Sequence, residues 1–235
     1  MGNDFTAIIL AAGQGKRMNS QVAKQFLMLE DKPVLYYSLK AFEDSDVDRI
    51  ILVTGEDQVE YCRTNIVEHY GFEKVTDVIG GGKERYNSVY NALIKIKLTD
   101  YVLIHDGARP FISKDMIKTI MEQVILNKAC LIGTPVKETI KVVDFDGTIT
   151  ATPNRNTLWV AQTPQAFDYT SIRKAYDLLL METNPDSLGI TDDAMVYESY
   201  SKLPIKMIMG DYNNIKLTTP EDLVWAEGIL KQLLF

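Results

Sequence analysis

The stretch AIILAAGQGKRM, residues 7–18, begins as an apolar run and ends in a glycine-rich turn that carries two cations, Lys16 and Arg17. An apolar run of this length is typical of a buried β-strand, and the small residues that follow it indicate a loop. Four further runs of this kind follow, at residues 49–54, 74–79, 101–105 and 129–134. The stretch at 7–18 is therefore predicted to be the first of several strands that each end in a loop.

Helical patterns separate these strands. Apolar residues recur at helical spacing in 34–42, 59–70, 89–96 and 113–125, and Thr219-Pro220 starts a last helix. Strands that alternate with helices predict a mostly parallel, twisted sheet with helices on both faces. We therefore expect an α/β fold, a single Rossmann-like domain over residues 1–235.

One segment departs from the alternation of strands and helices. Residues 137–143 and 148–152 are β-prone, and Asp146-Gly147 between them is a strong hairpin signal. A lone two-stranded ribbon is only marginally stable in water. We therefore expect residues 137–157, here called the arm, to project from the domain and to pack on a second subunit of a homodimer.

Charge and cysteine content limit the function classes. The chain has 25 Lys and Arg against 32 Asp and Glu, a net charge of −7, whereas proteins that grip nucleic acid are usually basic. The longest apolar run, 7–12, is too short to span a membrane. Cys62 and Cys130 lie far apart in apolar surroundings and are expected to be free thiols of a cytoplasmic protein. Neither nucleic acid nor membrane is expected as a partner.

The turn at Gly13 and Gly15 does not fit the two best-known phosphate loops. A dinucleotide-binding turn needs a third glycine where Met18 stands, and the chain has no G-x-x-x-x-G-K-[ST] sequence. A glycine-rich turn after the first strand of an α/β sheet nevertheless lies where ligands bind, and its free N–H groups suit phosphate. An ordinary solvated turn is the alternative.

Other candidate residues follow later strands. Gly80-Gly81-Gly82 comes after the third strand, and consecutive glycines let a flat ligand approach the backbone. Asp106 follows the fourth strand, and one carboxylate beside phosphate oxygens suits Mg²⁺. Both segments are expected at the same sheet edge as the first loop. A flexible turn and a turn-capping aspartate are the alternatives.

These loops occur in the order found in one enzyme family. The chain resembles the 2-C-methyl-D-erythritol 4-phosphate cytidylyltransferases, the third enzymes of the non-mevalonate isoprenoid pathway. The matching motifs are L-A-A-G-x-G-x-R-M at 10–18, K-Q-F at 24–26, G-G-x-E-R-x-x-S-V at 81–89, H-D-G-A-R-P at 105–110, R-x-x-L-W-x-A-Q-T-P-Q at 155–165, T-D-D-A at 191–194 and N-I-K-x-T-T-P-E-D-L at 214–223.

The resemblance implies a reaction and its residues. CMP is transferred from CTP to 2-C-methyl-D-erythritol 4-phosphate, with Mg²⁺ and release of pyrophosphate. Catalytic roles fall on Arg17, Lys24, Arg155 and Lys216, and Asp106 holds the metal. The CTP contacts fall on Ala11, Ala12, Gly13, Gly15, Gly82 and Ser88. The residues expected to bind the acceptor phosphate are Thr139, Arg155, Thr163 and Lys216, with Thr139 and Arg155 supplied by the partner's arm.

Two positions depart from the family pattern, and rival functions remain. Asn213 stands where several relatives carry an acid, and Lys83 replaces a frequent aspartate beside the base, so neither is assigned a role. The nearest rival is a ribitol-5-phosphate cytidylyltransferase of teichoic acid synthesis. The run Pro153-Asn154-Arg155 is similar to one in those enzymes. A non-catalytic nucleotide-binding module is the rival from another class. Arg17, Lys24 and Asp106 together favour an enzyme.

Overall fold

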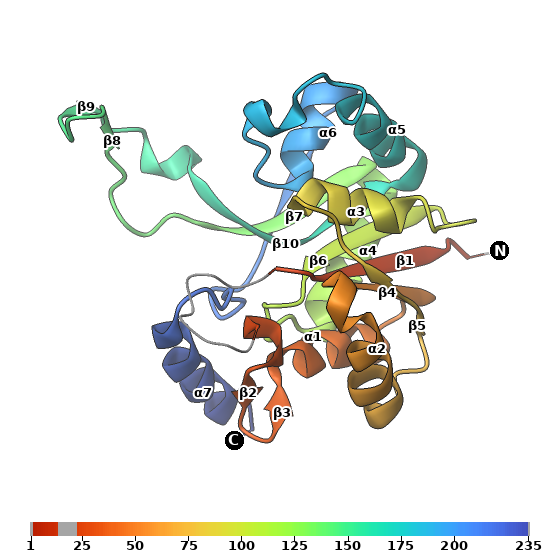
Figure 1. Cartoon of the computed structure of the whole chain (residues 1–235). Coiled ribbons are helices and arrows are strands. Elements are labelled where there is room, and N and C mark those ends of the chain that lie inside the picture. The colour runs from red at the N-terminus through yellow and green to blue at the C-terminus, as the bar shows by residue number, and fades with distance from the viewer. Residues whose placement is uncertain (1, 14–22, 235) are drawn as a thin grey trace.

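A central sheet organises the chain. The computed structural model describes residues 2–13 and 23–234. Seven strands form the sheet: β1 (Phe5–Ala11), β4 (Arg49–Thr54), β5 (Val75–Gly80), β6 (Tyr101–Asp106), β7 (Ala129–Pro135), β10 (Trp159–Asp168) and β11 (Lys206–Met209). Their order is β11-β7-β10-β6-β1-β4-β5 (Figure 1). The five strands predicted from apolar runs all form, with ends that shift by at most two residues.

The sheet is mostly parallel, as expected. β1 pairs in parallel with β4 and β6, β4 with β5, and β7 with β11. β10 is the exception, because it runs antiparallel between β6 and β7. The carboxyl ends of β1, β5 and β6, each of which leads into a predicted loop, therefore lie at one edge.

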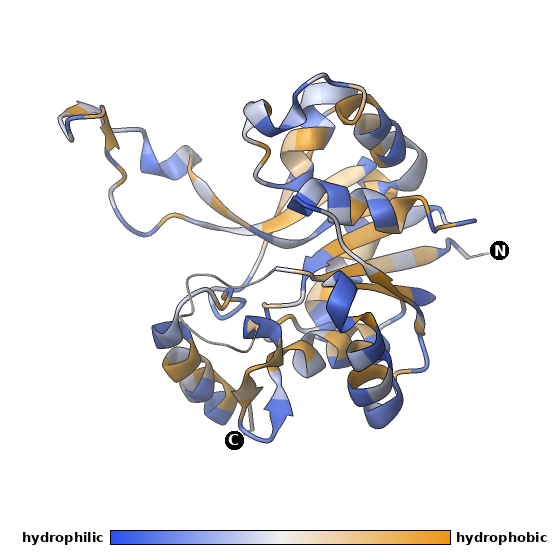
Figure 2. Ribbon diagram, in the orientation of Figure 1, coloured by the Kyte–Doolittle hydropathy of each residue, from blue (hydrophilic) through white to orange (hydrophobic). Residues whose placement is uncertain are grey.

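Helices cover both faces of the sheet. The first face packs on α1 (Val34–Glu43), on α2 (Val59–Cys62) with the π-helical turn that continues it, and on α4 (Lys114–Asn127). The opposite face packs on α3 (Arg85–Leu93), α5 (Tyr169–Leu179) and α6 (Asp193–Ser201). Side chains alternate along each strand, so Ile8 and Ile9 enter different cores. Figure 2 shows the apolar strands inside and polar outer helix surfaces.

A third, smaller core lies beside the sheet. α7 (Pro220–Leu234) packs its Ala226 and Leu230 against Leu29 of the short β2 (Met28–Leu29) and against Leu217. β2 pairs with β3 (Lys32–Pro33) in a sheet of two strands among the described residues. This core fixes the segment that precedes α7, and that segment carries Lys216.

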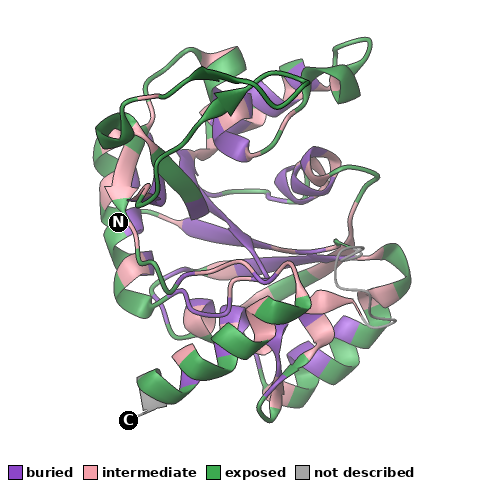
Figure 3. Ribbon diagram, turned by 90° about the vertical axis from the view of Figure 1, so that its left-hand side faces the viewer, coloured by how far each residue is buried: buried purple, intermediate pink, exposed green. Residues whose placement is uncertain are grey.

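The hairpin predicted in the arm is present but shorter than expected. Its strands are β8 (Val142–Val143) and β9 (Ile149–Ala151), and they form a sheet of their own. The turn closes through Asp144, whose backbone oxygen accepts from the Gly147 nitrogen, and Gly147 adopts a φ of 81° that favours glycine. The arm projects from the domain (Figure 1), and Figure 3 shows that it is exposed while the central strands are buried.

β10 and β11 are the strands of the central sheet that sequence patterns did not predict, and the helices α5 and α6 were not predicted either. The β10 sequence contains Gln162, Thr163, Pro164 and Gln165, which are not typical of a central strand. The structure accommodates them through a shift of register between Ala161 and Gln165, so Pro164 lies outside the ladder. β11 has only four residues at the sheet edge, too few for a clear pattern.

Candidate active site

A cavity of about 730 Å³ opens at the carboxyl ends of β1 and β6. Five segments line it, namely the end of β1, the turn at Lys24 and Gln25, the glycine-rich loop with the start of α3, the end of β6, and the segment of Lys216. This is the edge at which the sequence places the ligand. Its lining residues are Leu10, Ala11, Ala12, Gly13, Lys24, Gln25, Gly82, Lys83, Glu84, Arg85, Ser88, Asp106, Ala108 and Lys216.

Most of the predicted site residues meet in this cavity, but some do not. Those that line it are Ala11, Ala12, Gly13, Lys24, Gly82, Ser88, Asp106 and Lys216. Gly15 and Arg17 lie outside the described residues. Thr139, Arg155 and Thr163 are not among the lining residues of their own chain's cavity.

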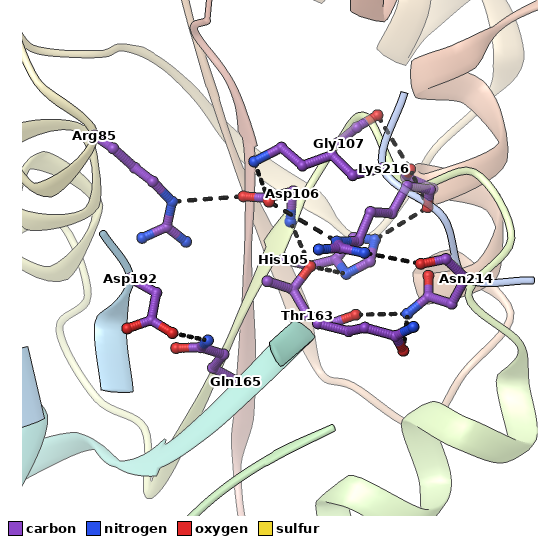
Figure 4. Close-up of polar contacts among 12 residues, drawn as sticks. Arg85, His105, Asp106, Gly107, Thr163, Gln165, Asp192, Asn214 and Lys216 are labelled. Carbon is purple, nitrogen blue, oxygen red and sulfur yellow. Dashed lines mark hydrogen bonds and ion pairs between the residues drawn. The ribbon is translucent and has the colours of Figure 1, made fainter. Parts of the chain in front are cut away.

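Asp106 is the centre of charge in the cavity. Its side chain is 11% exposed, and the Lys216 Nζ lies 2.7 Å from its Oδ2 (Figure 4). The Nε of Arg85 lies 3.5 Å from Oδ1, and the Nε of Arg109 lies 3.9 Å from Oδ2. Burial by itself raises the pKa of a carboxyl, but the charges of Arg85, Lys216 and Arg109 outweigh it and hold the pKa of Asp106 far below its usual range. Asp106 is therefore ionised.

A buried hydroxyl fixes the backbone of Asp106. The Asp106 amide donates to Thr163 Oγ1 at 3.0 Å, and Thr163 Oγ1 lies 3.0 Å from His105 Nδ1. The other ring nitrogen, Nε2, faces the Arg109 carbonyl at 3.3 Å and must carry the proton, because a carbonyl only accepts. Thr163 therefore donates to His105, and burial lowers the pKa of His105 to about 4, so the ring is neutral. The Thr163 hydroxyl bonds within the protein, and its contact with substrate stays a prediction.

The glycine-rich loop packs tightly on the rest of the cavity wall. A Cβ on Gly81 would lie 2.6 Å from Ala12 Cβ and 2.7 Å from Ser88 Oγ, so a larger residue is excluded there. The Gly82 amide donates to Ser88 Oγ at 3.0 Å, and Ser88 is 4% exposed. The loop is thus held in shape by Ser88, one of the residues predicted to contact CTP.

The other wall depends on two amide side chains. The buried Gln25 donates from Nε2 to the Ala11 carbonyl at 2.6 Å, which anchors the short helical turn of Lys24 beside β1. Asn214 donates from Nδ2 to the Thr163 carbonyl at 3.0 Å, which anchors the segment that carries Lys216. Lys24 and Lys216 therefore come from segments that are bonded to the sheet.

The arm residues lie apart from the cavity. Arg155 is exposed, and its Nη1 donates to the Lys137 carbonyl at 2.9 Å, across the arm. The Lys137 Nζ lies 3.6 Å from the ring centre of Tyr212, whose hydroxyl donates to the Pro135 carbonyl at 3.0 Å. Thr139 is also exposed. These contacts hold the base of the arm and leave its predicted phosphate-binding side chains at the surface.

Sequence reasoning missed two arginines of this centre. Arg85 and Arg109 approach Asp106, yet the motifs that contain them were used only for Gly82, Ser88 and Asp106. The available signal was an arginine three residues after Gly82 and another three residues after Asp106. Among the described residues no group of three or more His, Cys, Asp or Glu could hold a metal by itself. No helix of the described chain is long and apolar enough to cross a membrane.

An α/β sheet with lysines and an ionised carboxylate at its carboxyl edge defines a protein that binds a phosphorylated ligand. Comparisons with known proteins narrow this class. The family model of IspD, 2-C-methyl-D-erythritol 4-phosphate cytidylyltransferase, matches residues 5–232. The chain belongs to this family.

Relatives and solved structures agree. The chain is 54% identical over 227 residues to the 2-C-methyl-D-erythritol 4-phosphate cytidylyltransferase of Lachnoclostridium phytofermentans, over 97% of this chain and 96% of the relative. It matches the 4-diphosphocytidyl-2C-methyl-D-erythritol synthase structure from Anaerococcus prevotii with a TM-score of 0.84 and 31% identity, over 97% and 99% of the two chains. For the Francisella tularensis cytidylyltransferase the TM-score is 0.77 and the identity 29%, over 96% and 99%.

Proposed function

We propose that the cavity binds CTP and transfers its CMP to 2-C-methyl-D-erythritol 4-phosphate, with release of pyrophosphate. One observation carries the proposal: Lys24, Lys216 and Asp106 share a single cavity in a chain of this family. Lysines and glycine-loop amides are suited to a triphosphate.

The chemistry needs charge more than acid–base groups. The attacking phosphate monoester is already an anionic nucleophile, so no general base is required. Two unit charges about 4 Å apart at an effective dielectric of 20 repel by roughly 4 kcal/mol, so two polyanions need several cations between them. Lys24 and Lys216 stand in the cavity, and we assign the same task to Arg17 and Arg155. Catalysis then comes from positioning and from stabilisation of the crowded α-phosphate.

The donor chemistry at the end of β6 fits Mg²⁺. This ion is usually held by one or two carboxylates, with waters and phosphate oxygens as its other ligands. Asp106 is one ionised carboxylate in the cavity and is our candidate ligand. When bound, the ion supplies positive charge to phosphate oxygens.

A second copy of the chain completes the site in this proposal. Arg155 and Thr139 do not reach their own chain's cavity, which supports a role in the cavity of a partner. The hairpin of the arm exposes Val142, Val143, Phe145 and Ile149, each at least 45% exposed. An apolar tip of this kind suits burial between protomers of a homodimer. We further propose that the enzyme works in the cytoplasm, which the free thiols of Cys62 and Cys130 support.

A pyrophosphate-release assay tests the reaction. The purified chain is given CTP and Mg²⁺ with 2-C-methyl-D-erythritol 4-phosphate, with ribitol 5-phosphate, or with no acceptor. We expect rapid release only with the first acceptor. Preference for ribitol 5-phosphate would identify the teichoic acid activity instead, and nucleotide binding without turnover would favour a non-catalytic module.

A further inference from the structure

A buried carboxylate holds one of the cavity's arginines. Asp193, at the start of α6, is fully buried, and its Oδ1 and Oδ2 accept from Arg85 Nη1 at 2.9 Å and Nη2 at 2.6 Å. The hydroxyl of the buried Tyr176 donates to Asp193 Oδ1 at 2.6 Å. Such a two-point pair fixes the plane of the guanidinium as well as its place.

The position of Asp193 is itself set by β10. The Gln165 side chain accepts at Oε1 from the Ala194 amide at 2.8 Å and donates from Nε2 to Asp192 Oδ2 at 2.9 Å (Figure 4). Gln165 pairs with Ile104 in the neighbouring β6, two residues before Asp106. The start of α6 and the end of β6 are therefore fixed to the same part of the sheet.

This arrangement restricts what Arg85 can do. The terminal nitrogens of its guanidinium bond to Asp193. Its Nε faces Asp106 at 3.5 Å (Figure 4). An arginine that binds phosphate commonly uses a two-pronged edge of the guanidinium. Arg85 lines the cavity, yet both of its terminal nitrogens bond to the buried carboxylate of Asp193.

We propose that Arg85 and Asp193 are positioning residues: Asp193 holds Arg85 so that Arg85 fixes the carboxylate of Asp106. This inference rests on the proposed function, in which Lys216 offsets phosphate charge; to bind a phosphate, Lys216 has to leave Asp106, with which it is paired. Arg85 cannot follow Lys216, because Asp193 retains it. Asp106 therefore keeps one fixed cation beside Oδ1 throughout the reaction, and its other oxygen is available to the metal.

The proposal predicts a specific kinetic pattern. Asp193→Asn preserves shape but removes the charge that retains Arg85, and Arg85→Gln removes the link itself. Loss of a partner that orients a ligand typically lowers activity or metal affinity on the order of 10–100-fold. We expect kcat to fall by such a factor, the Mg²⁺ requirement to rise, and the KM for CTP to change little. Because Asp193 acts through Arg85, the double variant should be no worse than Arg85→Gln alone.

The chain contains a matched control. Arg173 pairs through Nε with Asp177 Oδ1 at 3.0 Å, and the Tyr90 hydroxyl donates to the same oxygen at 3.0 Å, away from the cavity. Asp177→Asn therefore breaks an Asp–Arg–Tyr group of the same composition, and its kcat and Mg²⁺ requirement should equal those of the wild type.

Stability is measured separately, because loss of one partner of a buried ion pair can unfold a protein. Thermal denaturation and circular dichroism identify the folded variants, and Tyr176→Phe provides a milder change at Asp193. Binding of Mn²⁺ in the presence of CTP, followed by electron paramagnetic resonance without acceptor, gives a readout independent of turnover. Weaker Mn²⁺ binding with retained CTP affinity supports the proposal.

Several results would overturn it. They are wild-type kcat in folded Asp193→Asn, additive losses in the double variant, or loss of CTP binding in Arg85→Gln, which would make Arg85 a phosphate ligand. A wild-type chain that does not turn over contradicts the proposed function instead, and the Mn²⁺ measurement then still decides whether Arg85 and Asp193 position Asp106.

Discussion

The cavity and the arm differ in how the rest of the chain supports their side chains. The cavity holds charged groups among fixed partners, whereas the arm exposes apolar groups to solvent. At the cavity, three cations lie within 4 Å of one ionised carboxylate, and sheet and helices hold them from several sides. In the arm, every residue from 137 to 157 except Pro153 is exposed, and Phe145 is exposed completely. The cavity is organised by its own chain, whereas the apolar side chains of the arm remain without cover there.

This difference has a functional meaning. Charges that must meet a nucleotide are fixed in advance, which lowers the reorganisation needed during reaction. Residues that we assign to the acceptor are placed on an extension that is exposed in the single chain. One half of the site is therefore expected to be complete in a monomer, and the other half only in a dimer.

The largest expected effect tests the cavity half. Lys24→Ala should lower kcat on the order of 10²–10³-fold, because loss of one donor to a group that gains charge in the transition state has this effect. The KM for CTP should rise less. Steady-state kinetics measure both, with the exposed Lys118→Ala on α4 as the control. A kcat near that of the wild type would contradict the assignment.

Asp106 provides the next test of the cavity. Asp106→Asn removes the candidate ligand of the metal and the partner of Lys216, so turnover should demand far more Mg²⁺. Titration of activity with Mg²⁺ measures this, and Glu122→Gln, an exposed acid on α4, is the control. The same Mg²⁺ dependence in both variants would exclude Asp106 from the metal site.

The third test joins the two regions. Lys24→Ala and Arg155→Ala subunits, each inactive alone, are co-expressed with different tags. If the arm serves the partner, one site of each mixed dimer carries both lesions and the other carries neither. About half of the dimers are mixed, so roughly a quarter of wild-type activity should return, by counting sites under two-fold symmetry. If Arg155 serves its own chain, mixed dimers demonstrated by their tags show no recovery.

The smallest effect on chemistry is expected at the tip of the arm. Phe145→Asp removes an apolar side chain whose burial would stabilise a dimer by about 1.5–3 kcal/mol. The Kd of the dimer should rise, so the variant dissociates at protein concentrations at which the wild type stays dimeric, as measured by analytical ultracentrifugation. Its kcat should be retained at a protein concentration that saturates the dimer. Leu98→Asp, at another exposed apolar residue, should have no such effect. An unchanged dimer would exclude Phe145 from the interface.

Sequence patterns predicted the parts of the molecule whose physics is local. Apolar runs located β1, β4, β5, β6 and β7, and Asp146-Gly147 located the hairpin turn. β10 was not predicted, because its buried glutamines and threonine depend on hydrogen-bond partners that are distant in sequence. One such partner is the Asp211 carbonyl, which accepts from Gln162. The Arg85–Asp193 pair spans 108 positions along the chain, and no local pattern reports such a contact. The family motifs included both residues without indicating that they touch.

The pairing of Pro135 with Trp159 has a consequence for how such a chain can evolve. The two ends of the arm lie opposite each other on neighbouring strands, so residues 137–157 are an enlarged loop of the β7–β10 hairpin. The entropy of closing a loop grows only slowly with its length. Insertions, deletions and exchanges in this loop should therefore leave the register of the sheet intact. If the arm binds the acceptor, as we propose, lineages can alter acceptor recognition there while the nucleotide cavity stays under separate selection.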